Sequence, residues 1–120
     1  ICNSHNVEVA KRMRERCKIL IAVGDCATFG GVPAMRNLVG TEAALKRAYL
    51  ETESVVGGLI PNSPELGTPL ETVTAVDKVV KVDLFIPGCP PRADAFYYAL
   101  TELLAGRTPI ILPPELFTYD

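Results

Sequence analysis

Two apolar runs that each end at a glycine organise the chain. The first, KILIAVG, covers residues 18–24, and the second, VKVDLFIPG, covers residues 80–88. Short, continuous apolar runs rich in β-branched residues are typical of strands that are buried on both faces of a parallel sheet. We therefore predict two such strands, each followed by a cysteine.

Helical spacing of apolar residues precedes and separates these strands. Residues 4–17 predict a first helix, capped by Asn3 or Ser4, and residues 41–51 predict a second, capped by Thr41. In the second helix we expect three side chains to face inward: Ala44, Leu45 and Ala48.

A third helix is predicted after the second strand. It starts near residue 92, behind the sequence CPP, and Gly106 ends it. Its apolar stripe consists of Phe96, Leu100, Leu103 and Leu104. The long Gly-, Pro- and Thr-rich connection over residues 54–80 is of a length that usually serves a function or an interface, with a short helix expected within residues 72–79. Residues 110–112 are a candidate edge strand.

This order of elements predicts an α/β fold, in which helices cover both faces of a parallel sheet to make three layers. Two strands are few for such a sheet, so we expect one or two further strands upstream of Ile1. Residues 1–120 then form a single domain that lacks its N-terminal portion.

Composition narrows the function classes. Hydrophobic residues make up 48% of the chain and the net charge is −2, which fits a globular protein. The basic run of residues 11–18 continues a helical pattern and is interpreted as a solvated helix face, so no nucleic-acid partner is expected. No apolar run approaches the ~20 residues that span a bilayer.

Two of the four cysteines occupy matched positions. Cys26 follows Val23, the end of the first apolar run, by three residues, and Cys89 follows Ile86 in the same way. The carboxyl ends of parallel strands lie at one edge of the sheet, which we call the carboxyl rim, where open α/β sheets bind ligands. Two thiols on one rim predict a shared soft ligand such as an iron–sulfur cluster, which takes four thiolates.

The other two cysteines differ. Cys17 precedes the first strand and is expected at the opposite end of the sheet, as a buried apolar side chain. Cys2 starts the helix that leads away from the carboxyl rim, so geometry permits a ligand role without selecting it. A free thiol in a cap region is the alternative.

Glycines and prolines flank both matched cysteines. Gly30 and Gly31 allow close approach of the backbone, to a cluster or another chain, or form an ordinary tight turn. Pro90 and Pro91 stiffen the chain after Cys89, which suits a cluster ligand as well as a plain strand-to-helix turn.

Taken together, GDCATFGGVPAMRN and IPGCPPRADAFYYALTELLAG resemble the small subunit of [NiFe] hydrogenases and the related cluster-bearing subunit of respiratory complex I. Within that superfamily, GDCA followed by VPAMRN is most similar to the cytoplasmic, bidirectional NAD-reducing hydrogenases. The resemblance implies a flavodoxin-like domain that carries the proximal [4Fe–4S] cluster. Cys26 and Cys89 match two of its four ligands, and the other two are expected upstream of Ile1.

The resemblance also implies roles for neighbouring residues. The residues expected around the cluster are Gly24, Asp25, Thr28, Gly30, Gly31, Gly88 and Pro90, although Asp25 could instead cap the turn after its strand. The residues expected to face a partner subunit, or a flavin, are Val32, Pro33, Arg36 and Asn37. The implied partners are a Ni–Fe large subunit, which splits H2, and diaphorase subunits, which reduce NAD+. FMN is possible in the family.

Three alternatives stay open. A quinone-reducing complex I-type or membrane-bound hydrogenase subunit would use the same cluster with another electron acceptor. A flavodoxin-like flavin- or nucleotide-binding module would carry Cys26 and Cys89 as plain thiols. A thiol enzyme with Cys26 as nucleophile lacks an indicated base, because the only histidine, His5, lies in a different unit.

Overall fold

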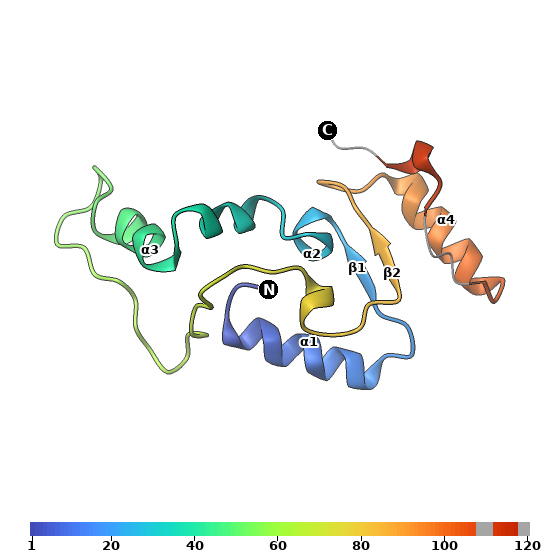
Figure 1. Ribbon diagram of the computed structural model, residues 1–120, viewed down its shortest axis with the longest axis horizontal. Coiled ribbons are helices and arrows are strands. Elements are labelled where there is room, and N and C mark those ends of the chain that lie inside the picture. The colour runs from blue at the N-terminus through green and yellow to red at the C-terminus, as the bar shows by residue number, and fades with distance from the viewer. Residues whose placement is uncertain (108–111, 118–120) are drawn as a thin grey trace.

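A parallel pair of short strands, β1 (Ile21–Val23) and β2 (Leu84–Ile86), forms the centre of the molecule. The computed structural model describes residues 1–107 and 112–117 and measures 57 × 33 × 19 Å. Figure 1 shows α3 and α4 at opposite ends of this elongated shape. The remaining elements are α1 (Ser4–Arg16), α2 (Asp25–Thr28), η1 (Val32–Leu38), α3 (Thr41–Tyr49), η2 (Val76–Lys78), α4 (Ala93–Leu104) and η3 (Pro114–Leu116).

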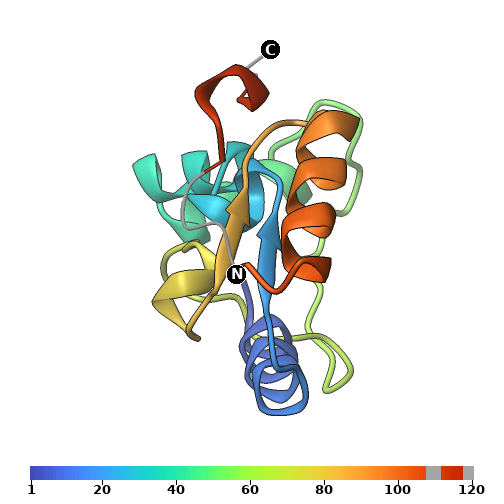
Figure 2. The ribbon, with the colours of Figure 1, turned by 90° about the vertical axis from the view of Figure 1, so that its right-hand side faces the viewer.

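Helices lie on both sides of the strand pair. Ile21 pairs with Leu84 and Val23 with Ile86, so these side chains share the face on which α4 packs. Ala22, whose partner in the register is Phe85, lines a cavity together with residues of α1 and with Val76 of η2. Figure 2 shows α4 on one side of the strand pair and η2 on the other. The predicted α/β class with a parallel sheet is confirmed, and the arrangement is consistent with a flavodoxin-like fold.

The core lies between β2 and α4. Its buried members are Leu84, Ile86, Ala95, Ala99 and Leu112. The two alanines let the α4 backbone approach the sheet closely. Of the predicted apolar stripe of α4, only Leu103 packs against the core. Phe96 and Leu100 are exposed, and Leu104 is 89% exposed, so the prediction that the stripe faces the core is largely wrong.

The first strand is shorter and less covered than predicted. Of residues 18–24 only Ile21–Val23 are in β1, and although Ala22 is 3% exposed, Val23 is 42% exposed. Among the described residues β1 pairs with β2 alone, so one of its edges has no strand beside it. Of the candidate edge strand, residues 110–111 lie outside the described residues, and Leu112 is in the core.

An ion pair fixes α1 at the amino end of the strands. Arg14 pairs with Asp83, whose Oδ2 also accepts a hydrogen bond from the Leu20 amide at 2.8 Å. The hydrogen bond from Arg14, followed by that from Leu20, lowers the pKa of Asp83 below its ordinary value. At the other end of α1, Asn3 caps the helix as predicted. Cys17, which follows α1, is half-buried rather than buried.

The long connection folds back along the start of the chain. The Leu70 amide donates to the Cys2 carbonyl at 3.0 Å, and the Thr74 amide donates to the Ile1 carbonyl at the same distance. The Thr41 hydroxyl donates to the carbonyls of residues 70 and 71, and Gly40 is the cap of α3, so the predicted capping role of Thr41 is wrong. Ala48 of α3 is exposed, so the expectation that it faces inward is wrong. The short helix expected within residues 72–79 is η2.

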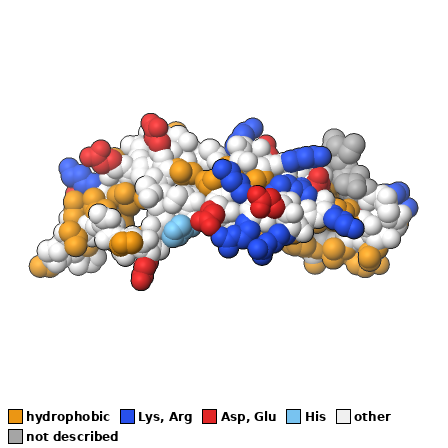
Figure 3. Space-filling view, turned by 90° about the horizontal axis from the view of Figure 1, so that it is seen from below, with side chains coloured by type: hydrophobic (Ala, Val, Ile, Leu, Met, Phe, Trp, Pro, Cys, Tyr) orange, Lys and Arg blue, Asp and Glu red, His pale blue; other side chains and the backbone are white. Residues whose placement is uncertain are grey.

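Basic side chains gather over α1 (Figure 3), as expected for a solvated helix face. The same view shows hydrophobic side chains along the α4 end of the molecule. Within the part of the chain that the structure describes, none of the helices is both long and apolar enough to cross a membrane.

Candidate functional site

Cys26 and Cys89 leave the sheet from adjacent positions on its carboxyl rim. Val23 and Ile86 pair directly, and each cysteine follows three residues later. The Gly24 amide extends the ladder by donating to the Ile86 carbonyl at 2.8 Å. Both cysteines are free thiols and both are exposed. The structure therefore brings together the two segments that the sequence predicted to share a ligand.

Asp25 and Gly88 join the two cysteine-bearing loops directly. The Gly88 amide donates to Asp25 Oδ1 at 2.6 Å, and the Asp25 amide donates to the Gly88 carbonyl at 3.2 Å. Gly88 is buried, so its amide needs a partner within the protein. The Asp25 side chain thus bonds across to the other loop and does more than cap its own turn.

The loop that carries Cys26 is tied to the end of its own strand. Cys26 lies in the single-turn helix α2, and the Thr28 hydroxyl donates to the Gly24 carbonyl at 2.8 Å. The buried Gly30 donates through its amide to the Asp25 carbonyl at 3.1 Å. These bonds tie the backbone around Cys26 to the end of β1 and to the first residue of α2.

Gly31 lies against the Cys26 thiol. A Cβ atom added to Gly31 would lie 3.1 Å from Cys26 Sγ and 3.0 Å from its backbone nitrogen, and the φ of +51° disfavours any side chain. This close approach is made within the chain's own loop, as in a tight turn, and approach of a cluster or of another chain to Gly31 stays a prediction. The space beside this thiol is kept free of side-chain atoms on the Gly31 side.

The loop that carries Cys89 is equally constrained. Gly88 has a φ of +132°, and a Cβ there would lie 2.5 Å from the Pro91 Cα. The Cys89–Pro90 peptide bond is cis. Only glycine fits at position 88, and the following prolines direct the chain into α4.

Cys2 is not brought to this pair. Its thiol donates to Asn6 Oδ1 at 3.0 Å, and its amide donates to the same oxygen at 3.1 Å. Among residues 1–107 and 112–117, no three His, Cys, Asp or Glu side chains form a group that could hold a metal ion. The described residues thus offer two thiols at the carboxyl rim, Cys26 and Cys89.

The segment predicted to face a partner shows two kinds of side chain. Val32 is 73% exposed and Pro33 is exposed, at the start of η1. Arg36 donates to the Leu70 carbonyl at 2.8 Å, and Asn37 exchanges two hydrogen bonds with the Val73 backbone, at 2.7 and 2.8 Å. No pattern in the sequence indicated this bracing of the long connection. Contact with a partner stays a prediction for all four residues.

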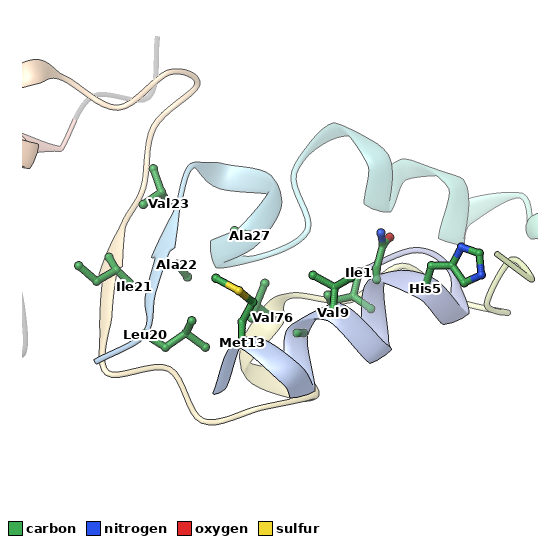
Figure 4. A pocket seen from close by; sticks show the side chains of 12 residues that line it. Ile1, His5, Val9, Met13, Leu20, Ile21, Ala22, Val23, Ala27 and Val76 are labelled. Atoms are coloured by element: carbon green, nitrogen blue, oxygen red, sulfur yellow. The ribbon is translucent and has the colours of Figure 1, made fainter. Parts of the chain in front are cut away.

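An apolar cavity of about 350 Å³ opens between α1 and β1 (Figure 4). Ala22 lines it from β1 and Leu20 from the residue before the strand, while Met13 and Val76 line it from α1 and η2. It lies beside the strand with an unpaired edge. None of the described residues that line it is Asp, Glu, Lys or Arg, so it offers little to a charged ligand.

These features define a class: an α/β protein that presents two cysteines on the carboxyl rim of a parallel sheet. The chain belongs to the family described as NADH ubiquinone oxidoreductase, 20 Kd subunit, whose model matches residues 1–103. This confirms the resemblance seen in the sequence. The family is one of oxidoreductase subunits.

Two relatives show which hydrogenase subunits in this family the chain is similar to. It is 41% identical to the NAD-reducing hydrogenase HoxS subunit delta of Cupriavidus necator, covering 100% of this chain and 58% of the relative. A crystal structure of an NAD+-reducing [NiFe]-hydrogenase in the H2-reduced state matches with a TM-score of 0.91 and 40% identity, covering 100% of this chain and 67% of that one. The chain therefore spans a little over half the length of the HoxS subunit.

The name of a further relative indicates an iron–sulfur cofactor in that protein. The iron-sulfur subunit of the F420-non-reducing hydrogenase of Archaeoglobus profundus is 33% identical, over 89% of this chain and 36% of that relative. Iron–sulfur chemistry is thus general among such proteins. The names of these relatives give no support to the FMN that the resemblance allows.

Proposed function

We propose that this chain is part of the electron-transfer small subunit of an NAD-reducing [NiFe] hydrogenase, and that Cys26 and Cys89 are two ligands of its proximal [4Fe–4S] cluster. One observation carries the proposal: the two thiols follow directly paired residues of parallel strands and are exposed on the same rim. The 41% identity to a subunit of the NAD-reducing hydrogenase HoxS supports NAD+, and not a quinone, as the final electron acceptor.

The residues present fit such a cluster. Thiolates are the ligands that iron–sulfur clusters take. Gly31 keeps side-chain atoms away from Cys26 Sγ, and Asp25, bound to Gly88, joins the two loops. A cluster bound here would supply one-electron transfer between a hydrogen-splitting centre and an acceptor. The chain's own contribution is to hold two thiols in fixed positions, which limits rearrangement when charge moves.

The other two ligands are proposed to lie upstream of Ile1, on a strand beside β1. Two backbone hydrogen bonds show which residues of the first strand face β2. The Gly24 amide donates to the Ile86 carbonyl, and the Leu20 carbonyl accepts from the Asp83 amide, so the amides and carbonyls of every second residue point toward β2. The groups of Ile21 and Val23 then face the outer edge of β1, where a further parallel strand could pair. Such a strand would end on the same carboxyl rim as Cys26.

The proposed partners are a Ni–Fe large subunit and NAD-reducing diaphorase subunits, in a cytoplasmic complex. In this complex the chain passes electrons from H2 oxidation toward NAD+, giving NADH and H+. The main alternative is a complex I-type or membrane-bound relay with the same cluster. A subunit of the NADH-quinone oxidoreductase of Bacteroides fragilis is 44% identical, over only 49% of this chain and 33% of that relative.

Iron and acid-labile sulfide analysis of the full-length protein, purified without oxygen, tests the cluster. About four irons and four sulfides per chain are expected for one [4Fe–4S] cluster. Absence of iron would overturn the proposal, and a bound flavin without iron would favour the flavodoxin-like module instead. Nickel in the co-purified complex, with H2-dependent reduction of NAD+ but not of a quinone, separates the hydrogenase from its complex I-type alternative.

A further inference from the structure

The bond between the Asp25 carboxylate and the Gly88 amide joins segments 63 residues apart in the chain. It is short, 2.6 Å, and it lies directly between the two loops that carry Cys26 and Cys89. Within the described residues, Asp25 alone bonds across these two loops through its side chain. The other hydrogen bonds between them, from Gly24 to Ile86 and from Asp25 to Gly88, are made by backbone amides.

We infer that Asp25 is a positioning residue for the proposed cluster: its carboxylate fixes Cys89 relative to Cys26 and places a negative charge beside the metal site. This inference rests on the proposed function. A carboxylate that accepts a backbone N–H bond forms a charge-assisted bond, which is stronger than a neutral one. It satisfies the amide of the buried Gly88.

Two separable consequences follow. Geometrically, loss of the acceptor leaves the Gly88 amide unpaired and leaves only backbone hydrogen bonds between the Cys89 and Cys26 loops. Electrostatically, the charge of Asp25 opposes the gain of an electron by a nearby cluster and so holds its reduction potential down. An asparagine keeps an oxygen for the Gly88 amide but removes the charge, whereas an alanine removes both.

The test compares Asp25→Asn and Asp25→Ala in the full-length protein within its complex. Glu42→Gln is the matched control, because it removes one exposed carboxylate in α3, at the far end of the molecule (Figure 1). For Asp25→Asn we expect cluster retention near that of the unmodified protein and a more positive midpoint potential in an EPR-monitored redox titration. For Asp25→Ala we expect the cluster to be lost to an iron chelator about 10-fold faster or more, the scale typical of lost outer-shell contacts.

An equal midpoint potential in Asp25→Asn and Glu42→Gln would overturn the electrostatic part, and unchanged cluster retention in Asp25→Ala would overturn the positioning part. The geometry has a readout that needs no iron: hydrogen exchange of the Gly88 amide in iron-free full-length protein. Exchange should be faster in Asp25→Ala than in Asp25→Asn, and equal rates contradict the inference. If the native protein contains no iron, the proposed function is overturned. The exchange experiment would still show whether the Asp25 carboxylate bonds to the Gly88 amide.

Discussion

Val23 and Ile86 lie side by side in the parallel register, and each is followed three residues later by an exposed cysteine. This single pairing determines that Cys26 and Cys89 leave the sheet on the same rim. It converts two motifs that are far apart in the sequence into one site. The proposed iron–sulfur function depends on this relationship.

The glycine beside the Cys26 thiol provides a first prediction. Gly31→Ala should lower the free energy of unfolding by about 1–3 kcal/mol, because an alanine is strained at a φ of +51°. It should also reduce the iron content, because the new Cβ would lie 3.1 Å from Cys26 Sγ. Denaturant unfolding and iron analysis of the full-length protein measure the two effects.

Gly40 offers the matched control for this substitution. Its φ is +86°, so Gly40→Ala carries similar backbone strain, but a Cβ there would meet nothing within 4 Å. We expect the two variants to lose comparable stability while only Gly31→Ala loses iron. Equal iron content in both variants would show that the space beside Cys26 is not needed.

The Arg14–Asp83 pair provides a prediction about pH. Because the folded pKa of Asp83 lies below its ordinary value, about 3.9, the pair stabilises the fold fully above that value. The stabilisation is lost as the pH falls through the lowered folded pKa. Asp83→Asn should therefore flatten the loss of stability below about pH 4, measured as the unfolding midpoint against pH.

Arg14 binds the chain beyond α1 as well, donating to the Cys17 carbonyl at 2.6 Å. Asp83→Asn should hence lower stability at neutral pH without unfolding the protein. The exposed pair of Arg12 and Glu8 serves as the control, and Glu8→Gln should leave the acid dependence almost unchanged. An identical acid profile for Asp83→Asn and the unmodified protein would contradict the assigned role of this pair.

The exposed start of η1 provides a prediction about the partner subunit. Val32→Asp should weaken association with the proposed large subunit, because a charge on a surface that becomes buried loses its hydration. Iron content should not change. Val56→Asp is the control, since Val56 is 98% exposed in the long connection. Equal affinity of both variants in a co-purification or surface-binding assay would place the interface elsewhere.

The positions of the two thiols could be predicted because they follow from one regularity, the shared direction of parallel strands. The Asp25–Gly88 bond could not, since it joins residues that only the completed sheet brings together. The buried face of α4 was also missed. The large apolar side chains of Phe96 and Leu100 were expected to face the core, but both are exposed. The small residues Ala95 and Ala99 are buried instead, because they allow α4 to pack closely on β2.

Bracing of the long connection was missed for a similar reason. Polar residues such as Asn37 and Thr41 carry no sequence signal that distinguishes a partner contact or a cap from a bond to a distant backbone segment. Both bind residues 70–73, with separations of 36 positions for Asn37 and 29 for Thr41. The choice depends on where the chain returns, and local patterns do not contain that information.

The central claim is tested most directly by replacing each rim cysteine in the full-length protein and recording its visible absorption and iron content. Cys26→Ser and Cys89→Ser should each abolish or strongly reduce the broad absorption of an iron–sulfur cluster. Cys17→Ser, at the opposite end of β1, should leave it unchanged. Unchanged absorption and iron in both rim variants would contradict the ligand assignment.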